Sequence, residues 1–142
     1  MKRLILPLIL IALVVTTSSC SHKHNPYRSP KTIAKAFAEN LYTGKFDEAK
    51  TLATPESEPI INFFQHAFPP EHFEGCDHID CGEITVTNTS DSTAICKFIV
   101  YLCNGTTGNE ATKVIKRDGK WYVSLRDING GGSVPAGNGP QQ

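Results

Sequence analysis

The chain has 142 residues with 14 basic and 14 acidic side chains, so its formal net charge at pH 7 is zero. Without a basic excess, nothing in the composition favours a nucleic-acid partner or electrostatic attachment to anionic lipid. Once a leader and two terminal segments are set aside, about 100 residues remain, which is enough for one hydrophobic core and too few for two.

The first twenty residues have the pattern of a secretory signal that ends at a cysteine. Lys2 and Arg3 precede an apolar run from Leu4 to Val15, and small residues lead to Cys20. The run is too short for a retained membrane-spanning helix. The pattern resembles the lipobox of bacterial lipoproteins, in which the cysteine sulfur is acylated and the signal is removed. We therefore expect residues 1–19 to be a signal peptide and Cys20 to become the lipidated first residue.

Lipidation makes membrane lipid the first expected partner, through acyl chains such as palmitate on Cys20. One chain holds a protein only marginally, whereas two or more hold it firmly. Ser21 follows the cysteine, where Asp retains Gram-negative lipoproteins in the inner membrane, so we expect a lipid-anchored envelope protein at the outer membrane. Residues 20–28 are interpreted as the anchor and a polar tether.

Three helices are predicted in the first half of a domain that spans residues 29–128. Each has apolar residues three and four positions apart; the first and the third begin at a proline, and the second has Asp47 and Glu48 in its first turn. The helices are expected to begin at Ser29-Pro30, Phe46 and Glu58-Pro59 and to end at Gly44, Thr54-Pro55 and Pro69-Pro70.

From Gly82 onward the hydrophobic period changes to two, which is typical of strands. The fold class is therefore α+β, with the N-terminal helices packed on a curved antiparallel four-stranded meander. Residues 129–142 are rich in Gly and Pro and are expected to form a flexible tail. The four predicted strands are Glu83 to Thr87, Thr93 to Cys103, Glu110 to Arg117 and Lys120 to Arg126.

Several motifs in the domain recur together in one known family. They are Gly44-Lys45-Phe46-Asp47-Glu48-Ala49, Ser92-Thr93-Ala94 and Lys116-Arg117-Asp118-Gly119-Lys120-Trp121-Tyr122-Val123. With the capped first helix, they resemble small bacterial envelope lipoproteins of unknown function that carry a nuclear-transport-factor-2-like (NTF2-like), cystatin-like domain. The resemblance covers roughly residues 29–127 and implies a cone-shaped fold with a possible pocket at its mouth. It implies no particular reaction, because this fold hosts enzymes, carriers and scaffolds.

Four cysteines remain after Cys20, and outside the cytoplasm a disulfide is the default expectation. Cys96 and Cys103 lie on one predicted strand about 23 Å apart, so they cannot pair with each other. We expect one bridge among Cys76, Cys81 and Cys103, with the pair Cys81–Cys103 slightly ahead of Cys76–Cys81, and Cys96 in the core. Should all four pair, the remaining choices are 76–96 with 81–103 or 76–103 with 81–96.

The segment from His66 to Cys81 offers an alternative function, a zinc-binding or hydrolytic module. Its candidate metal ligands are thiolates and imidazoles, the groups that zinc prefers. The C-x4-C spacing is looser than the usual C-x2-C, and a disulfide would consume the thiols, so the main expectation is that no metal or cofactor is bound. The candidate ligands are His72, Cys76, His78 and Cys81.

The inward positions expected on the predicted strands carry no acid or base, and the sequence offers only His66 as a general base. A non-enzymatic module that binds a protein, glycan or small molecule, or has a structural role, is therefore favoured over an enzyme, with no catalytic residues assigned. Asp91-Ser92-Thr93 resembles a short O-glycosylation signal at Ser92, although a plain turn explains the same residues. Aromatic residues that could line an apolar pocket are Phe63, Phe64, Phe98 and Trp121.

Overall fold

The computed structural model of the protein describes residues 25–126. The expected signal peptide, Cys20 and the C-terminal tail lie outside the described residues, so the interpretations of these segments stay predictions. Within residues 25–126, no helix combines the length and the hydrophobicity that crossing a membrane requires.

Helices form the first half of the domain, as the sequence predicts. Ser29 caps the first helix: its hydroxyl accepts a hydrogen bond from the Thr32 amide, and the Thr32 hydroxyl oxygen accepts one from the Ser29 amide. This reciprocal capping box satisfies amides that would otherwise lack partners. The helical elements are η1 (Pro26–Arg28), α1 (Pro30–Tyr42), α2 (Phe46–Thr51), η2 (Pro55–Ser57), α3 (Glu58–Ala67) and η3 (Pro70–Phe73).

The second half is one curled antiparallel sheet, which confirms the predicted meander. β3 pairs with β4, and β4 pairs with β5 through the tight turn at Asp118-Gly119. The other side of β3 is covered by two separate strands, β1 near its end and β2 near its start. The strands are β1 (Asp80–Cys81), β2 (Thr85–Ser90), β3 (Thr93–Tyr101), β4 (Thr107–Arg117) and β5 (Lys120–Val123).

The sheet edge formed by β1 and β2 differs from the sequence prediction of one strand from Glu83 to Thr87. Cys81 lies opposite Val100, and the Gly82 amide donates to the Ile99 carbonyl at 2.8 Å, after which pairing stops until Thr85. The short β1 was missed because two residues carry no detectable period.

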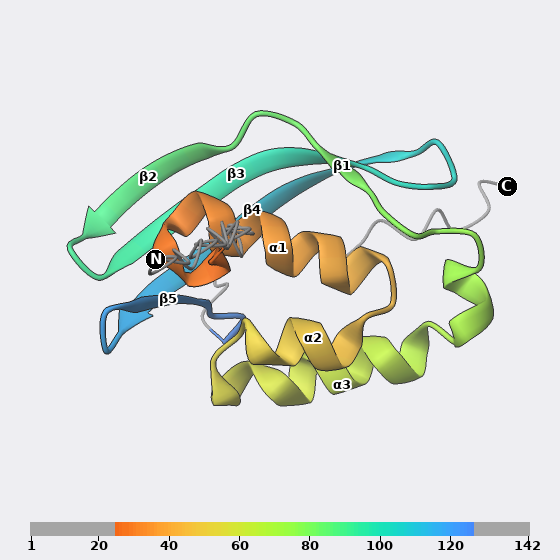
Figure 1. Cartoon of the computed structure of the whole chain (residues 1–142), viewed down its shortest axis with the longest axis horizontal. Coiled ribbons are helices and arrows are strands. Elements are labelled where there is room, and N and C mark those ends of the chain that lie inside the picture. Colours follow the sequence, from red (N-terminus) through yellow and green to blue (C-terminus); the bar gives the residue numbers. More distant parts are fainter. Residues whose placement is uncertain (1–24, 127–142) are drawn as a thin grey trace, which may run out of the picture.

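The helices cover the concave face of this sheet in layers (Figure 1). α1 contacts β3, β4 and β5 directly, α2 packs on α1, and α3 packs on α2. One buried core lies between α1 and the sheet, and it includes most of the predicted inward positions. Its fully buried members include Ile33, Ala34, Cys96, Val100, Val114 and Val123.

The opposite edge of the sheet is closed by the chain between α2 and η2. The Thr54 amide donates to the Val123 carbonyl at 2.8 Å, and the Val123 amide donates to the Leu52 carbonyl at 2.9 Å. Behind this junction the buried Ser57 hydroxyl lies 2.9 Å from the Thr54 hydroxyl and accepts a hydrogen bond from the Leu125 amide at 2.9 Å. These bonds tie the last strand to the helical layer.

Candidate functional site

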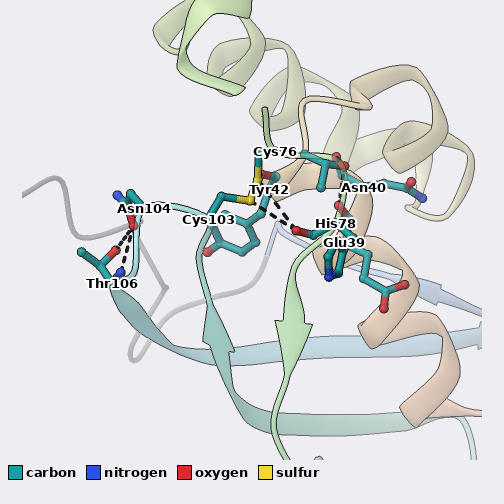
Figure 2. The surroundings of a disulfide bond; sticks show 9 residues. Glu39, Asn40, Tyr42, Cys76, His78, Cys103, Asn104 and Thr106 are labelled. Carbon is teal, nitrogen blue, oxygen red and sulfur yellow. Dashed lines mark hydrogen bonds between the residues drawn. A yellow bond between two sulfur atoms is a disulfide. The ribbon is translucent and has the colours of Figure 1, made fainter. Parts of the chain in front are cut away.

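A disulfide between Cys76 and Cys103 marks one end of the domain. It joins the segment between η3 and β1 to the residues just after β3, and its Cα atoms are 5.6 Å apart. Figure 2 shows both cysteines beside Tyr42, the last residue of α1. The Cys103 sulfur lies 3.2 Å from the His78 carbonyl oxygen, and the Cys76 sulfur lies 3.7 Å from that of Tyr42. The bridge therefore fastens the segment after η3 to the end of β3, beside the end of α1.

This bridge confirms one disulfide among the three expected cysteines, but the favoured pair Cys81–Cys103 is wrong. Cys81 lies opposite Val100 in the β1–β3 ladder, three positions before Cys103. Three residues of strand span about 10 Å, beyond the Cα separation that a disulfide tolerates. The pair Cys76–Cys81 is wrong as well, because the Cys76 sulfur is already bonded.

Cys81 and Cys96 are free thiols, so the schemes with two bridges are also wrong. Cys96 is buried in the core, as expected, and its thiol donates to the Pro30 carbonyl at 3.4 Å. Burial raises the pKa of the Cys96 thiol to about 11. Burial, followed by the Glu39 carboxylate, raises the pKa of the Cys81 thiol to about 11. Both thiols are therefore protonated at neutral pH.

The alternative zinc site at His72, Cys76, His78 and Cys81 is wrong. The sulfur of Cys76 is bonded to Cys103 and offers no thiolate to a metal. No group of three or more metal-binding side chains is arranged around a common point within residues 25–126. His66 is exposed near the end of α3, and its Nδ1 lies 2.6 Å from the Asn62 carbonyl oxygen.

The four aromatic residues expected to line one pocket do not gather. Phe63 lies on the surface with 68% of its area exposed, whereas Phe98 and Trp121 belong to the core. Phe64 is half-buried on α3. Trp121 instead borders a hollow of about 420 Å³ beside residues 88–91, next to the exposed Ser92 in the β2–β3 turn. The prediction fails because aromatic residues at these periods mostly fill the core.

A different cavity lies beside the disulfide, with a volume of about 460 Å³. Three segments line it: Tyr42 at the end of α1, residues 71–76 of η3 and the following turn, and residues 102–104 after β3. The Asn104 side chain accepts hydrogen bonds from the amide and the hydroxyl of Thr106, which orders the turn on the β3 side. Figure 2 shows Tyr42, Asn104 and the disulfide at this corner. The cavity thus lies where the end of α1, the segment that connects α3 to β1, and the end of β3 meet.

Comparison with known proteins gives a structural match only. No family model and no curated protein matches the sequence. The crystal structure at 2.00 Å resolution of a Campylobacter jejuni protein, described as a "putative NTF2-like transpeptidase", superposes with a TM-score of 0.50. It is 19% identical and covers 69% of this chain and 99% of its own. The domain has the NTF2-like fold. This confirms the α+β architecture and the resemblance in fold.

The interior of the NTF2-like domain contains an acid that sequence reasoning missed. Glu110 lies opposite the buried Phe98 in the β3–β4 ladder, so its side chain is on the inner face of the sheet. The Tyr42 hydroxyl donates to Glu110 Oε1. Burial, followed by the Glu110 charge and this hydrogen bond, raises the pKa of the Tyr42 phenol, so the phenol stays protonated. In the sequence, Glu110 lies four positions before the apolar Val114, so the alternation of side chains along the strand places both on the same face.

A row of aromatic rings leads along the NTF2-like domain to the cavity. The centroid distances are 6.1 Å from Phe63 to Phe64, 6.2 Å from Phe64 to Phe68 and 5.0 Å from Phe68 to His72. His72 lies 5.2 Å from Phe73, and both of these last residues line the cavity. The row begins on exposed α3 and ends at the cavity wall.

Charge is unevenly distributed in the NTF2-like domain. Between Lys50 and Lys97 the sequence contains no Lys or Arg, although it contains eight acids. This stretch supplies α3, η3, β1 and β2, and therefore six of the residues that line the cavity. The acids are Glu56, Glu58, Glu71, Glu74, Asp77, Asp80, Glu83 and Asp91.

Proposed function

We propose that this protein is a lipid-anchored envelope protein whose NTF2-like domain is a non-enzymatic binding module, with the cavity beside the disulfide as its binding site. The observation that carries the proposal is that cavity, whose volume of about 460 Å³ falls in the range of small-molecule sites. Its lining combines polar and apolar side chains, from Glu71 to Leu102, as sites for small organic ligands do.

The disulfide supports a binding role because it fixes the cavity walls before any ligand arrives. Cys76 and Cys103 both line the cavity and belong to segments that are far apart in the sequence. A site that is already ordered loses little conformational entropy when it binds, so more of the contact energy appears as affinity.

The state of the reactive groups supports binding rather than group transfer. The structural neighbour is named as a transpeptidase, and acyl transfer by a cysteine needs a thiolate with a lowered pKa. The thiols of Cys81 and Cys96 have raised pKa values of about 11. The half-buried pair of Tyr42 and Glu110 is engaged in a hydrogen bond of its own, which favours a structural role for the phenol.

The binding site is tested by ligand-observed NMR on the full mature protein in detergent micelles, with a library of small polar and apolar fragments and empty micelles as background. We expect fragments to bind the parent and to be excluded by Glu74→Trp, which places an indole at the cavity wall. Glu58→Trp makes the same change of charge and size on exposed α3, away from the cavity lining, and should bind as the parent does. Fragments that bind all three proteins equally, or none of them, would contradict the assignment.

The anchor is tested separately by membrane fractionation and intact mass. The N-terminal sequence supports acylation at Cys20, so the native protein should sediment with membranes and carry the added mass of acyl chains. Cys20→Ser should appear in the soluble fraction without that mass. An unmodified amino terminus in the native protein would refute the anchor and leave the cavity assignment untouched.

A further inference from the structure

The charged side chains that line the cavity beside the disulfide are acidic. Glu71 and Glu74 are both exposed at its wall, and neither Lys nor Arg is among the lining residues. Lys45, next in sequence to Gly44, is exposed and lies outside the lining. Because the stretch from residue 51 to residue 96 contains no Lys or Arg, the neighbouring acids Asp77 and Asp80 add to the negative potential at this corner.

Aromatic side chains form a second, independent feature of the same cavity. Tyr42, His72 and Phe73 all line it, and Leu102 adds an aliphatic wall. Aromatic rings attract organic cations through the negative faces of their π-systems, and they also bury the apolar body of such a ligand. A hydrated metal ion would gain nothing from these walls. Carboxylates beside aromatic rings therefore favour a ligand that is both cationic and partly apolar.

Phe73 is held in place before a ligand arrives. Its ring packs edge-on against Phe46, with centroids 5.5 Å apart and an interplanar angle of 77°. It also lies against Gly44, where a Cβ atom would come within 2.8 Å of Phe73 Cδ2. A glycine at this position thus makes room for the ring. An aromatic wall that is already immobilised costs little further entropy on binding.

Tyr42 links the cavity wall to a carboxylate on the inner face of the sheet. Its hydroxyl donates to Glu110, whose carboxylate lies on the inner face of the sheet. The tyrosine ring stays neutral because the phenol keeps its proton. One side of the cavity is therefore a neutral aromatic ring whose hydroxyl is held by a carboxylate, so this ring is already ordered when a cation arrives.

Resting on the proposed binding site, we propose that the cavity binds small organic cations, with an ammonium group near Glu71 and Glu74 and its carbon substituents against Phe73, Tyr42 and Leu102. The shared chemistry is a primary or quaternary ammonium on an apolar stem. A free amine and a lysine side chain both supply it, and the two arms of the test below separate them.

The test compares cations with neutral molecules of the same shape, by ligand-observed NMR titration of the full mature protein in micelles. The first pair is choline and 3,3-dimethylbutan-1-ol. The second pair is Nα-acetyl-lysine methylamide, whose side-chain ammonium is free, and Nα-acetyl-norleucine methylamide. We expect at least one cation to bind about tenfold more tightly than its neutral partner, a difference of about 1.4 kcal/mol. The preference should shrink as salt is raised, because screening weakens exposed charges.

Charge-removing variants locate the effect. Glu71→Gln with Glu74→Gln should lower the affinity for the preferred cation about tenfold and leave the neutral partner unchanged. Glu58→Gln also removes a carboxylate, but on α3 outside the cavity lining, and should bind the cation as tightly as the parent does. Equal binding of cation and neutral partner, or a cation affinity that the double variant does not change, would overturn the inference. If neutral fragments bind the parent and are excluded by Glu74→Trp, the proposed binding site stands even when the cation preference is absent. If no fragment binds at all, both the binding site and the cation preference are refuted.

Discussion

Loss of the Cys76–Cys103 bridge should be the most damaging change of any pair of side chains at the cavity corner. The bridge closes a loop with a sequence separation of 27. The chain-entropy relation gives about 3.5 kcal/mol at 25 °C for a loop of that length. For a domain of about 100 residues, a loss of this size lowers the melting temperature by about 15 °C or more.

Urea unfolding of the Cys76→Ala/Cys103→Ala double variant, followed by circular dichroism, measures this loss directly. The matched control is Cys81→Ala, which removes a half-buried free thiol and should cost about 1 kcal/mol or less. The reasoning is refuted if the double variant loses less than about 1 kcal/mol, or if Cys81→Ala destabilises the protein as much as the double variant does. A bridge that involved Cys81 would give the second result.

Three further changes test the backbone, the buried hydroxyl and the two free thiols. Gly119→Ala should lower the free energy of unfolding by about 1 kcal/mol, and Gly44→Ala should lower it by clearly more. Both glycines have positive φ, but only at Gly44 would the new Cβ lie 2.8 Å from an aromatic carbon. Ser57→Ala should cost about 1–3 kcal/mol in urea unfolding, because it leaves a backbone amide and a threonine hydroxyl without their partner, and a wild-type midpoint would contradict this. The thiols of Cys81 and Cys96 have pKa values of about 11 in the folded protein and near 9 in the unfolded chain, so the free energy of unfolding should fall as pH rises from 9 to 11. The fall should be shallower in Cys96→Ala, which lacks one of the two thiols. An identical pH dependence in that variant would count against the raised pKa of Cys96.

The helices were predictable because their signals are local. Ser29 and Pro30 are adjacent and identify the start of α1, and the Pro69-Pro70 pair stops α3 without help from the rest of the chain. The Asp118-Gly119 turn likewise fixed the last hairpin, since both residues adopt positive φ there.

The disulfide pairing and the cavity depended on information that no single segment carries. Which cysteine reaches Cys103 is decided by the register of β1 on β3, and a two-residue strand leaves no period from which to read it. The cavity is built from three segments that are far apart in the sequence. The only sequence feature that indicated their meeting is the expected gathering of three cysteines at one end of the domain. Glu110 is an acid at an inner position, where apolar residues are the rule, so only its even spacing from Val114 indicates that it faces inward.

The two edges of the sheet are relevant to a protein that is concentrated on a lipid surface, as the proposed anchor would make this one. Unpaired strand edges are templates on which neighbouring copies add strands and grow into fibres. Here one border is interrupted between Gly82 and Thr85, and at the other border Leu52 and Thr54 bond Val123 at the end of β5. Neighbours confined to two dimensions therefore meet an interrupted template along β1 and β2 and a covered strand end at Val123, which disfavours strand-to-strand aggregation at these two places on a densely covered membrane.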